Sequence, residues 1–129
     1  MEIFEQVYLR GMHFRGSHAK AYVDTLYEGQ HLYLKREPRN KSDFNAIQVW
    51  NRPLDETELD TVTGEAIPTG FHFAYVGGES AVWIAPLLDE GKAMIATVTG
   101  VDRSGRTPYP VVTISELPES SIANDPDSE

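Results

Sequence analysis

The stretch that decides the fold is residues 34–49, which read Leu34-Lys35-Arg36-Glu37-Pro38-Arg39-Asn40-Lys41-Ser42-Asp43-Phe44-Asn45-Ala46-Ile47-Gln48-Val49. Apolar residues alternate with polar or aromatic ones at 32–35, before the central loop, and again at 47–50, after it. This period of two is typical of half-buried strands. The loop between the two strands is therefore held at both ends and is expected to present a binding surface.

The loop concentrates cations, amides, an acid and an aromatic residue that has no evident place in a core. These residues are Arg36, Arg39, Lys41, Asn40, Asn45, Asp43 and Phe44. The mixture suits charge pairing, amide hydrogen bonding and stacking at one site.

The composition fits one domain of ordinary size. The chain has 129 residues, of which 40% are hydrophobic, and no cysteine. We expect a domain over 1–116 and a disordered acidic tail over 117–129, where Pro, Ser, Asn and acids dominate. The acidic N-terminus lacks the basic region of a signal peptide, and no apolar run approaches a membrane span of roughly 20 residues. A soluble, cytoplasmic protein is expected.

The net charge of −9 disfavours a tight, nonspecific coating of nucleic acid. The charge is unevenly distributed, however. Residues 1–50 carry seven Lys/Arg against six Asp/Glu, whereas residues 51–129 carry four against fourteen. A mildly basic face in the first part of the chain is compatible with weak, salt-sensitive binding through few phosphate contacts.

Five or six strands and one or two short helices predict a mainly β fold, a small closed barrel of the OB or SH3-like kind. Strands are expected at 3–10, 31–36, 45–50, 71–76, 93–101 and 111–114, and a helix at roughly 80–90. Residues 18–28 fit either a short helix or an irregular strand. The acidic excursion at about 51–70 fits a long hairpin or a mobile loop.

Capping residues and prolines predict where the helix begins and ends and where the last strand lies in the sheet. Ser80 is the expected N-cap of the helix, and Gly91 is the expected stop. Pro86 predicts a kink or a later helix start, near Trp83, because proline removes a backbone donor. Pro108 and Pro110 place the last strand at a sheet edge.

Three ordered blocks resemble the HIRAN domain family. They are Gly11-Met12-His13-Phe14-Arg15-Gly16, the run from Arg36 to Ile47, and Tyr75-Val76-Gly77 followed by Ile84-Ala85-Pro86-Leu87-Leu88-Asp89-Glu90-Gly91. Together they cover most of residues 6–103. The resemblance implies a small β-barrel, here of the free-standing bacterial or phage type, that binds the 3′ end of single-stranded DNA and is an accessory to DNA repair or replication.

Carried over by position, the resemblance implies two walls of a binding groove. One wall would consist of His13, Phe14 and Arg15, and the other of Asn40, Asp43, Phe44 and Asn45, with Arg39 and Lys41 near phosphate and Tyr75 close by. Aromatic rings would stack on bases, and Asp43 would accept a hydrogen bond from a free 3′ hydroxyl. The eukaryotic members have an aromatic residue where this chain has Ser42 and an arginine where it has His13.

Structural roles compete with these assignments. Phe14 and Phe44 are equally compatible with burial in the core, and Asn45 is compatible with a role in bonding the loop backbone. The turn at 75–78 resembles a phosphate cradle, but a close-packed strand-to-helix turn is the stronger interpretation.

Enzymatic, metal and cofactor motifs are absent from the sequence. The histidines at 13, 18, 31 and 72 lack metal-ligand spacing, and no nucleophile elbow, phosphate loop or dinucleotide fingerprint occurs. We therefore expect a non-catalytic protein without cofactors. The alternative function is a protein-interaction module that contacts a basic partner, such as a nucleic-acid enzyme, through the acidic excursion and tail.

Overall fold

The computed structural model of this chain describes residues 2–117, except for the side chain of His13. Beyond Leu117, the predicted acidic tail lies outside the described residues. The elements in chain order are β1 (Ile3–Arg10), η1 (Met12–Phe14), α1 (Ser17–Val23), β2 (His31–Arg36), β3 (Ile47–Trp50), β4 (Thr57–Leu59), β5 (Ala66–Pro68), β6 (His72–Val76), α2 (Gly78–Asp89), β7 (Met94–Asp102) and β8 (Tyr109–Glu116).

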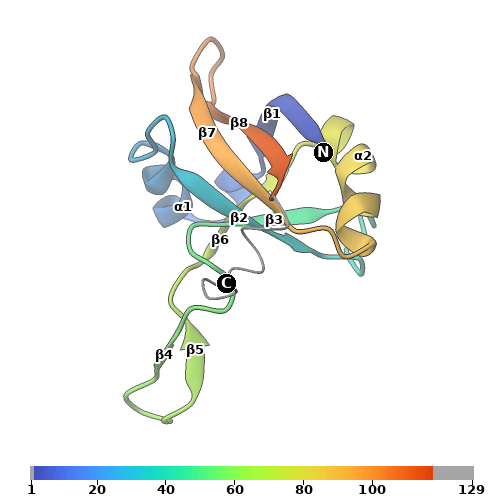
Figure 1. Cartoon of the computed structure of the whole chain (residues 1–129). Helices are drawn as coiled ribbons and strands as arrows, with labels where there is room; N and C mark the ends of the chain where they lie inside the picture. The colour runs from blue at the N-terminus through green and yellow to red at the C-terminus, as the bar shows by residue number, and fades with distance from the viewer. Residues whose placement is uncertain (1, 118–129) are drawn as a thin grey trace, which may run out of the picture.

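Six of these strands form a closed antiparallel barrel in the order β1-β6-β3-β2-β7-β8, with β8 pairing back onto β1 (Figure 1). The predicted alternation is confirmed in β2 and β3, where every second side chain is buried. Those side chains point into a core that contains fully buried Leu9, Leu32, Ile47 and Phe73. Each such side chain contributes about 1.5–3 kcal/mol by leaving water. The predicted mainly β barrel is confirmed, with six strands of the predicted five or six and two short helices of the predicted one or two.

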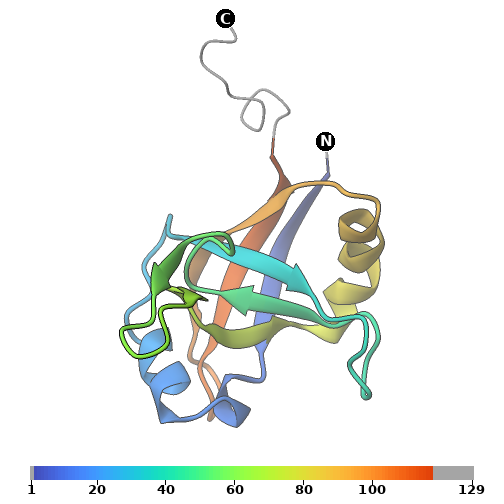
Figure 2. The ribbon, with the colours of Figure 1, turned by 90° about the horizontal axis from the view of Figure 1, so that it is seen from below.

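The two helices cover opposite ends of the barrel (Figure 2). The ambiguous segment at 18–28 forms most of α1, which buries Ala19 and Val23 and sets the Tyr22 ring edge-on to Phe73, with centroids 4.8 Å apart. α2 buries the predicted stripe of Ala81, Ile84 and Ala85.

α2 begins earlier than predicted and runs through its proline. Its N-cap is Gly77, not Ser80, and Pro86 lies inside the helix without delaying its start to Trp83. The helix continues beyond Pro86, because the Glu90 N–H donates to the Pro86 carbonyl at 3.0 Å. Proline deprives the carbonyl four residues earlier, at Val82, of its donor. Val82 lies on the exposed face, so water can serve that carbonyl.

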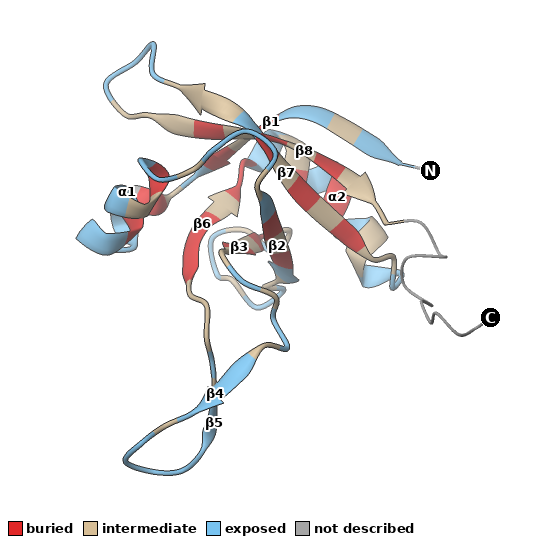
Figure 3. Cartoon of the chain, turned by 60° about the vertical axis from the view of Figure 1, so that its left-hand side comes forward, coloured by how far each residue is buried: buried red, intermediate tan, exposed pale blue. Residues whose placement is uncertain are grey.

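The acidic excursion is an ordered hairpin that projects away from the barrel (Figure 1). β4 and β5 pair in antiparallel fashion, with Thr57 opposite Pro68 and Leu59 opposite Ala66. Most of the hairpin is exposed (Figure 3). Of the two structures that the sequence allowed here, the hairpin is therefore the one formed.

The prediction of an edge position for the last strand is wrong, because β8 pairs with both β7 and β1. The prolines are nevertheless tolerated, because their missing N–H groups lie outside the pairing of β8 with β1. Pro108 precedes β8, and Pro110 lies beyond the last pair with β1, which is Tyr8 opposite Val111. A missing donor at Pro110 therefore costs no bond to β1.

Candidate functional site

The glycine-rich turn after β1 buries one side chain and exposes another. Gly11 has φ 82° and starts η1, in which Met12 is buried and Phe14 is 81% exposed. A Cβ at position 11 would lie 3.3 Å from Cδ2 of Tyr75. Gly11 therefore supplies both the left-handed backbone and the close approach to Tyr75.

The long loop between β2 and β3 is held by its own side chains. Oδ1 of Asn40 accepts the backbone N–H groups of Ser42 and Asp43 at 2.9 and 3.0 Å, and Oδ1 of Asp43 accepts the N–H of Asn45 at 2.9 Å. These are the local bonds that let Asn and Asp shape turns. Among the described residues, Asn40 and Asp43 bond the loop backbone through their side chains, and Asn45 does not.

Arg36 fastens the same loop to α2. Its guanidinium donates to the carbonyls of Ala46 and Phe44 at 2.7 and 2.9 Å, and to both carboxylate oxygens of Asp89 at 2.8 and 3.3 Å. The hydrogen bond from Arg36 holds the pKa of Asp89 below its usual range. This two-pronged pair is the geometry that arginine favours with carboxylates.

Glu37 connects the loop to the barrel face. Its Oε1 accepts from Gln48 Nε2 and from the Tyr75 hydroxyl, each at 2.8 Å, and its Oε2 accepts from Asn40 Nδ2 at 3.0 Å. Hydrogen bonds from Gln48, and then from Tyr75 and Asn40, lower the pKa of Glu37 despite partial burial. Burial and the Glu37 carboxylate raise the pKa of Tyr75. Glu37 therefore stays ionised and holds Asn40 and Tyr75 in position.

A pocket of about 310 Å³ lies between the turn after β1 and the long loop. Seven residues line it: Phe14, Asn40, Ser42, Asp43, Ala46, Tyr75 and Val76. The pocket thus brings together four residues predicted for the site, from segments up to 61 positions apart in sequence. We call it the Phe14 pocket.

The other predicted site residues whose side chains the structure describes do not line the Phe14 pocket. Arg15 is exposed and donates from Nε to the His72 carbonyl at 3.3 Å. Arg39 and Lys41 are exposed on the loop, Phe44 is 74% exposed, and Asn45 is half-buried. The side chain predicted at His13 is not described.

Sequence reasoning missed Glu37 and the lining residues Ser42, Ala46 and Val76. The local sequence gives one signal for Glu37. This polar residue lies just beyond the end of β2, and its side chain faces the polar side chain of Gln48. Its partner Tyr75 is 38 residues away, so the network itself requires the fold.

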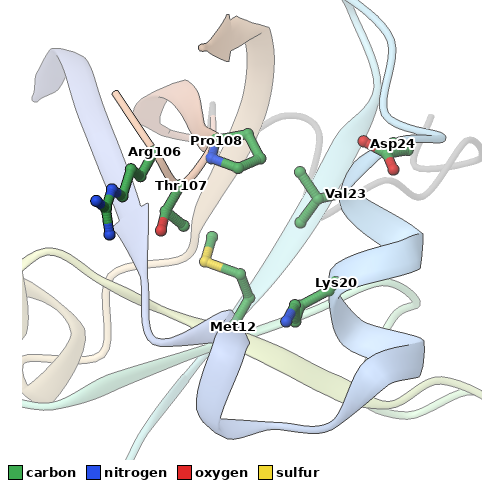
Figure 4. Close-up of a pocket in the computed structure, with 7 residues that line it drawn as sticks. All are labelled: Met12, Lys20, Val23, Asp24, Arg106, Thr107 and Pro108. Carbon is green, nitrogen blue, oxygen red and sulfur yellow. The ribbon is translucent and has the colours of Figure 1, made fainter. Parts of the chain in front are cut away.

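Two further cavities lie elsewhere on the barrel. One, of about 280 Å³, lies between α1 and the turn joining β7 to β8, where Val23 and Pro108 face each other across Met12 and Arg106 points away (Figure 4). The other, of about 450 Å³, lies between residues 22–33 and the root of the hairpin. Of the predicted site residues with a described side chain, none lines either cavity.

Within residues 2–117 the described side chains form no cluster of three or more His, Asp or Glu able to hold a metal ion. The same part of the chain has no helix with the length and apolar character needed to cross a membrane.

Comparison with known proteins gives one family and one similar structure. The HIRAN domain family matches residues 5–111. A crystal structure of a protein from Lactobacillus plantarum is 22% identical, covers 87% of this chain and 91% of its own, and superposes with a TM-score of 0.59. At that identity the similarity concerns the fold. No curated protein matches the chain.

Proposed function

Because this chain belongs to the HIRAN domain family, a family of nucleic-acid-binding modules, we propose that it binds single-stranded DNA at a 3′ end and has no catalytic activity of its own. The observation that carries this proposal is the Phe14 pocket. It combines an exposed aromatic ring, a carboxylate, an amide and a tyrosine ring in one concave site.

Each component suits one part of a strand terminus. The exposed Phe14 ring offers a face on which the last base can stack, an interaction worth about 1–3 kcal/mol for any base. One carboxylate oxygen of Asp43 accepts the Asn45 N–H, and within the described part of the chain Oδ2 takes no hydrogen bond. Oδ2 can therefore accept from a free 3′ hydroxyl, whereas a 3′ phosphate in its place would be repelled.

The test compares short single strands that differ only at the 3′ end, one with a free hydroxyl and one with a phosphate. Fluorescence anisotropy at low and moderate salt measures their dissociation constants. We expect tighter binding of the free hydroxyl, and loss of that preference in Asp43→Asn, which keeps an oxygen to cap the loop but removes the charge. Equal affinity of the wild type for both strands would contradict end recognition.

Phe14 and Phe44 form a matched pair for the stacking role, since both rings are largely exposed and only Phe14 lines the pocket. Phe14→Ala should weaken binding about 5- to 150-fold, which corresponds to 1–3 kcal/mol. Phe44→Ala should have a much smaller effect. Equal losses in the two variants would show that exposed aromatic area, rather than the pocket, governs binding.

The projecting hairpin favours a second candidate function, docking to a basic protein. Its tip exposes Leu59 and Val62 beside the acids Glu58, Asp60 and Glu65. Replacement of residues 54–69 by a short turn should leave the affinity for a three-nucleotide strand with a free 3′ hydroxyl unchanged and remove binding to such a partner. Loss of oligonucleotide binding in this variant would argue against two separate surfaces.

A further inference from the structure

An aromatic strip, formed by Tyr75, His72, Trp50 and Tyr33, runs across the outer face of three neighbouring strands, β6, β3 and β2. The His72 ring meets Tyr75 edge-on at 4.6 Å and lies nearly parallel to Trp50 at 6.3 Å. Trp50 is directly opposite Tyr33 in the pairing of β3 with β2. Their neighbours in sequence point into the core, so Tyr33 and Trp50 face outward.

The strip joins two cavities. Tyr75 lines the Phe14 pocket at one end, and Tyr33 lines the 450 Å³ cavity at the other. The second cavity is also lined by two more tyrosines, Tyr22 and Tyr27, and by Arg52. Two strand spacings of about 4.8 Å, roughly 10 Å in all, separate β6 from β2, so the strip itself has room for about two or three stacked nucleotides between the cavities.

Two cations lie beside the strip. Nζ of Lys35 lies 5.7 Å from the centre of the Trp50 ring, and Arg15 bonds the His72 carbonyl. The nearby acid Glu37 is already bonded by three donors, and Glu56 pairs with Arg52 at 3.6 Å. Rings for stacking with cations alongside are the combination by which proteins hold single-stranded nucleic acid.

His72 independently indicates that a ligand binds at the strip. The residue is 8% exposed, and its Nε2 has no hydrogen-bond partner within the described part of the chain. Buried polar atoms without a partner are uncommon in native proteins and often mark a place where a ligand or water completes the site.

We propose that the aromatic strip and the tyrosine-lined cavity beyond it bind the nucleotides on the 5′ side of the terminal ones, so that one strand occupies both pockets. This inference rests on the proposed function, since the 3′ end in the Phe14 pocket sets where the strand begins. The binding site then extends from the terminal nucleotides over β6, β3 and β2 to the root of the hairpin.

The test varies strand length while the free 3′ hydroxyl is kept. Two strands are compared by anisotropy: one of about three nucleotides, which is shorter than the roughly 4–16 that one such barrel covers, and one of about eight, which lies within that range. The wild type should bind the longer strand at least about tenfold more tightly, since each stacked base adds about 1–3 kcal/mol. Equal affinities for the two lengths would overturn the inference.

Exposed aromatics provide matched variants, because Tyr27 in the second cavity is 65% exposed and Trp83 on α2 is 68% exposed. Tyr27→Ala combined with Tyr33→Thr should remove most of the advantage of the longer strand, and Trp83→Ala should leave it intact. Both proteins should keep their discrimination against a 3′ phosphate on the short strand. Retention of the length advantage in the double variant would overturn the inference.

Trp50 itself reports occupancy of the strip. The chain has two tryptophans, so Trp83→Phe leaves Trp50 as the single indole. In that background the longer strand should quench the fluorescence and the three-nucleotide strand should not. If the protein prefers the short strand with a 3′ hydroxyl over the one with a 3′ phosphate, but neither strand length quenches Trp50, the proposed function stands and the inference fails. If the protein binds the short strand equally well with a 3′ hydroxyl and with a 3′ phosphate, the proposed function itself is refuted.

Discussion

Removal of the Glu37 carboxylate should both destabilise the protein and weaken DNA binding. In Glu37→Ala, three donors lose their acceptor: the Gln48 amide, the Tyr75 hydroxyl and the Asn40 amide. A hydrogen bond to a charged group contributes about 1.5–3 kcal/mol when buried. Glu37 is only partly buried, so water replaces part of each bond, and about 1 kcal/mol per bond is the more realistic figure. We expect a loss of about 3 kcal/mol in the free energy of unfolding, a large part of the usual 5–15 kcal/mol.

Glu37→Gln should lie between the wild type and Glu37→Ala. Its amide oxygen can still accept from Gln48 and Tyr75, but its NH₂ group then opposes the amide nitrogen of Asn40. Asn40 cannot rotate its amide to adapt, because its oxygen already accepts two loop N–H groups. We expect a cost of about 1–2 kcal/mol. Urea unfolding measures these values, and Glu90→Ala, which removes an exposed acid at the C-cap of α2, is the control.

The affinity for DNA gives a second and sharper readout. Removal of an acid alone should strengthen binding to a polyanion, since net repulsion falls. Glu37→Ala should instead weaken it, because Asn40 and Tyr75 no longer hold the shape of the Phe14 pocket. Tighter binding by Glu37→Ala, or a loss of stability no larger than that of Glu90→Ala, would refute the role assigned to this carboxylate.

Three further substitutions test the residues that hold the site in place. Gly11→Ala should cost about 1–2 kcal/mol in thermal or urea unfolding, because φ is 82° and the new Cβ lies 3.3 Å from Tyr75; an unchanged midpoint would contradict this. Arg36→Met should raise amide hydrogen exchange across 37–46, since Arg36 joins two loop carbonyls to Asp89; wild-type exchange rates would mean that the loop holds itself. Burial, reinforced by Arg15, lowers the pKa of His72 to about 4, so the unfolded chain binds one more proton between about pH 6.5 and 4. Stability should fall as the pH drops through that window, by about 2 kcal/mol from pH 7 to pH 5, and a His72→Phe variant should lack this component; parallel pH profiles would rule it out.

The strand pattern at 31–36 and 45–50 was enough to predict two strands of the barrel, because alternation by two depends on local geometry that every half-buried strand shares. The start of α2 was predicted less well. Ser80 is a better N-cap than Gly77 by residue type alone, but Gly77 lies where a Cβ would meet the Tyr8 carbonyl at 2.9 Å. Packing against β1, which is distant in sequence, therefore decides where the helix starts.

The positions of the predicted site residues also depend on contacts between segments that are distant in sequence. Phe14 and Phe44 are alike as residues, and both are exposed, yet only Phe14 lines the pocket. The choice depends on Met12, which anchors η1 in the core, and on the approach of Tyr75 to Gly11. Neither contact is visible in the local sequence.

Composition and the spacing of apolar residues along single segments were sufficient to predict the barrel class, the acidic excursion and the polar loop. Which polar side chains meet depends instead on the three-dimensional packing of the chain. The Glu37 network, the Arg36–Asp89 pair and the aromatic strip all join residues from different strands and helices. Strand register and helix packing bring these groups together. The whole hydrophobic core, rather than any one segment, determines that register and packing.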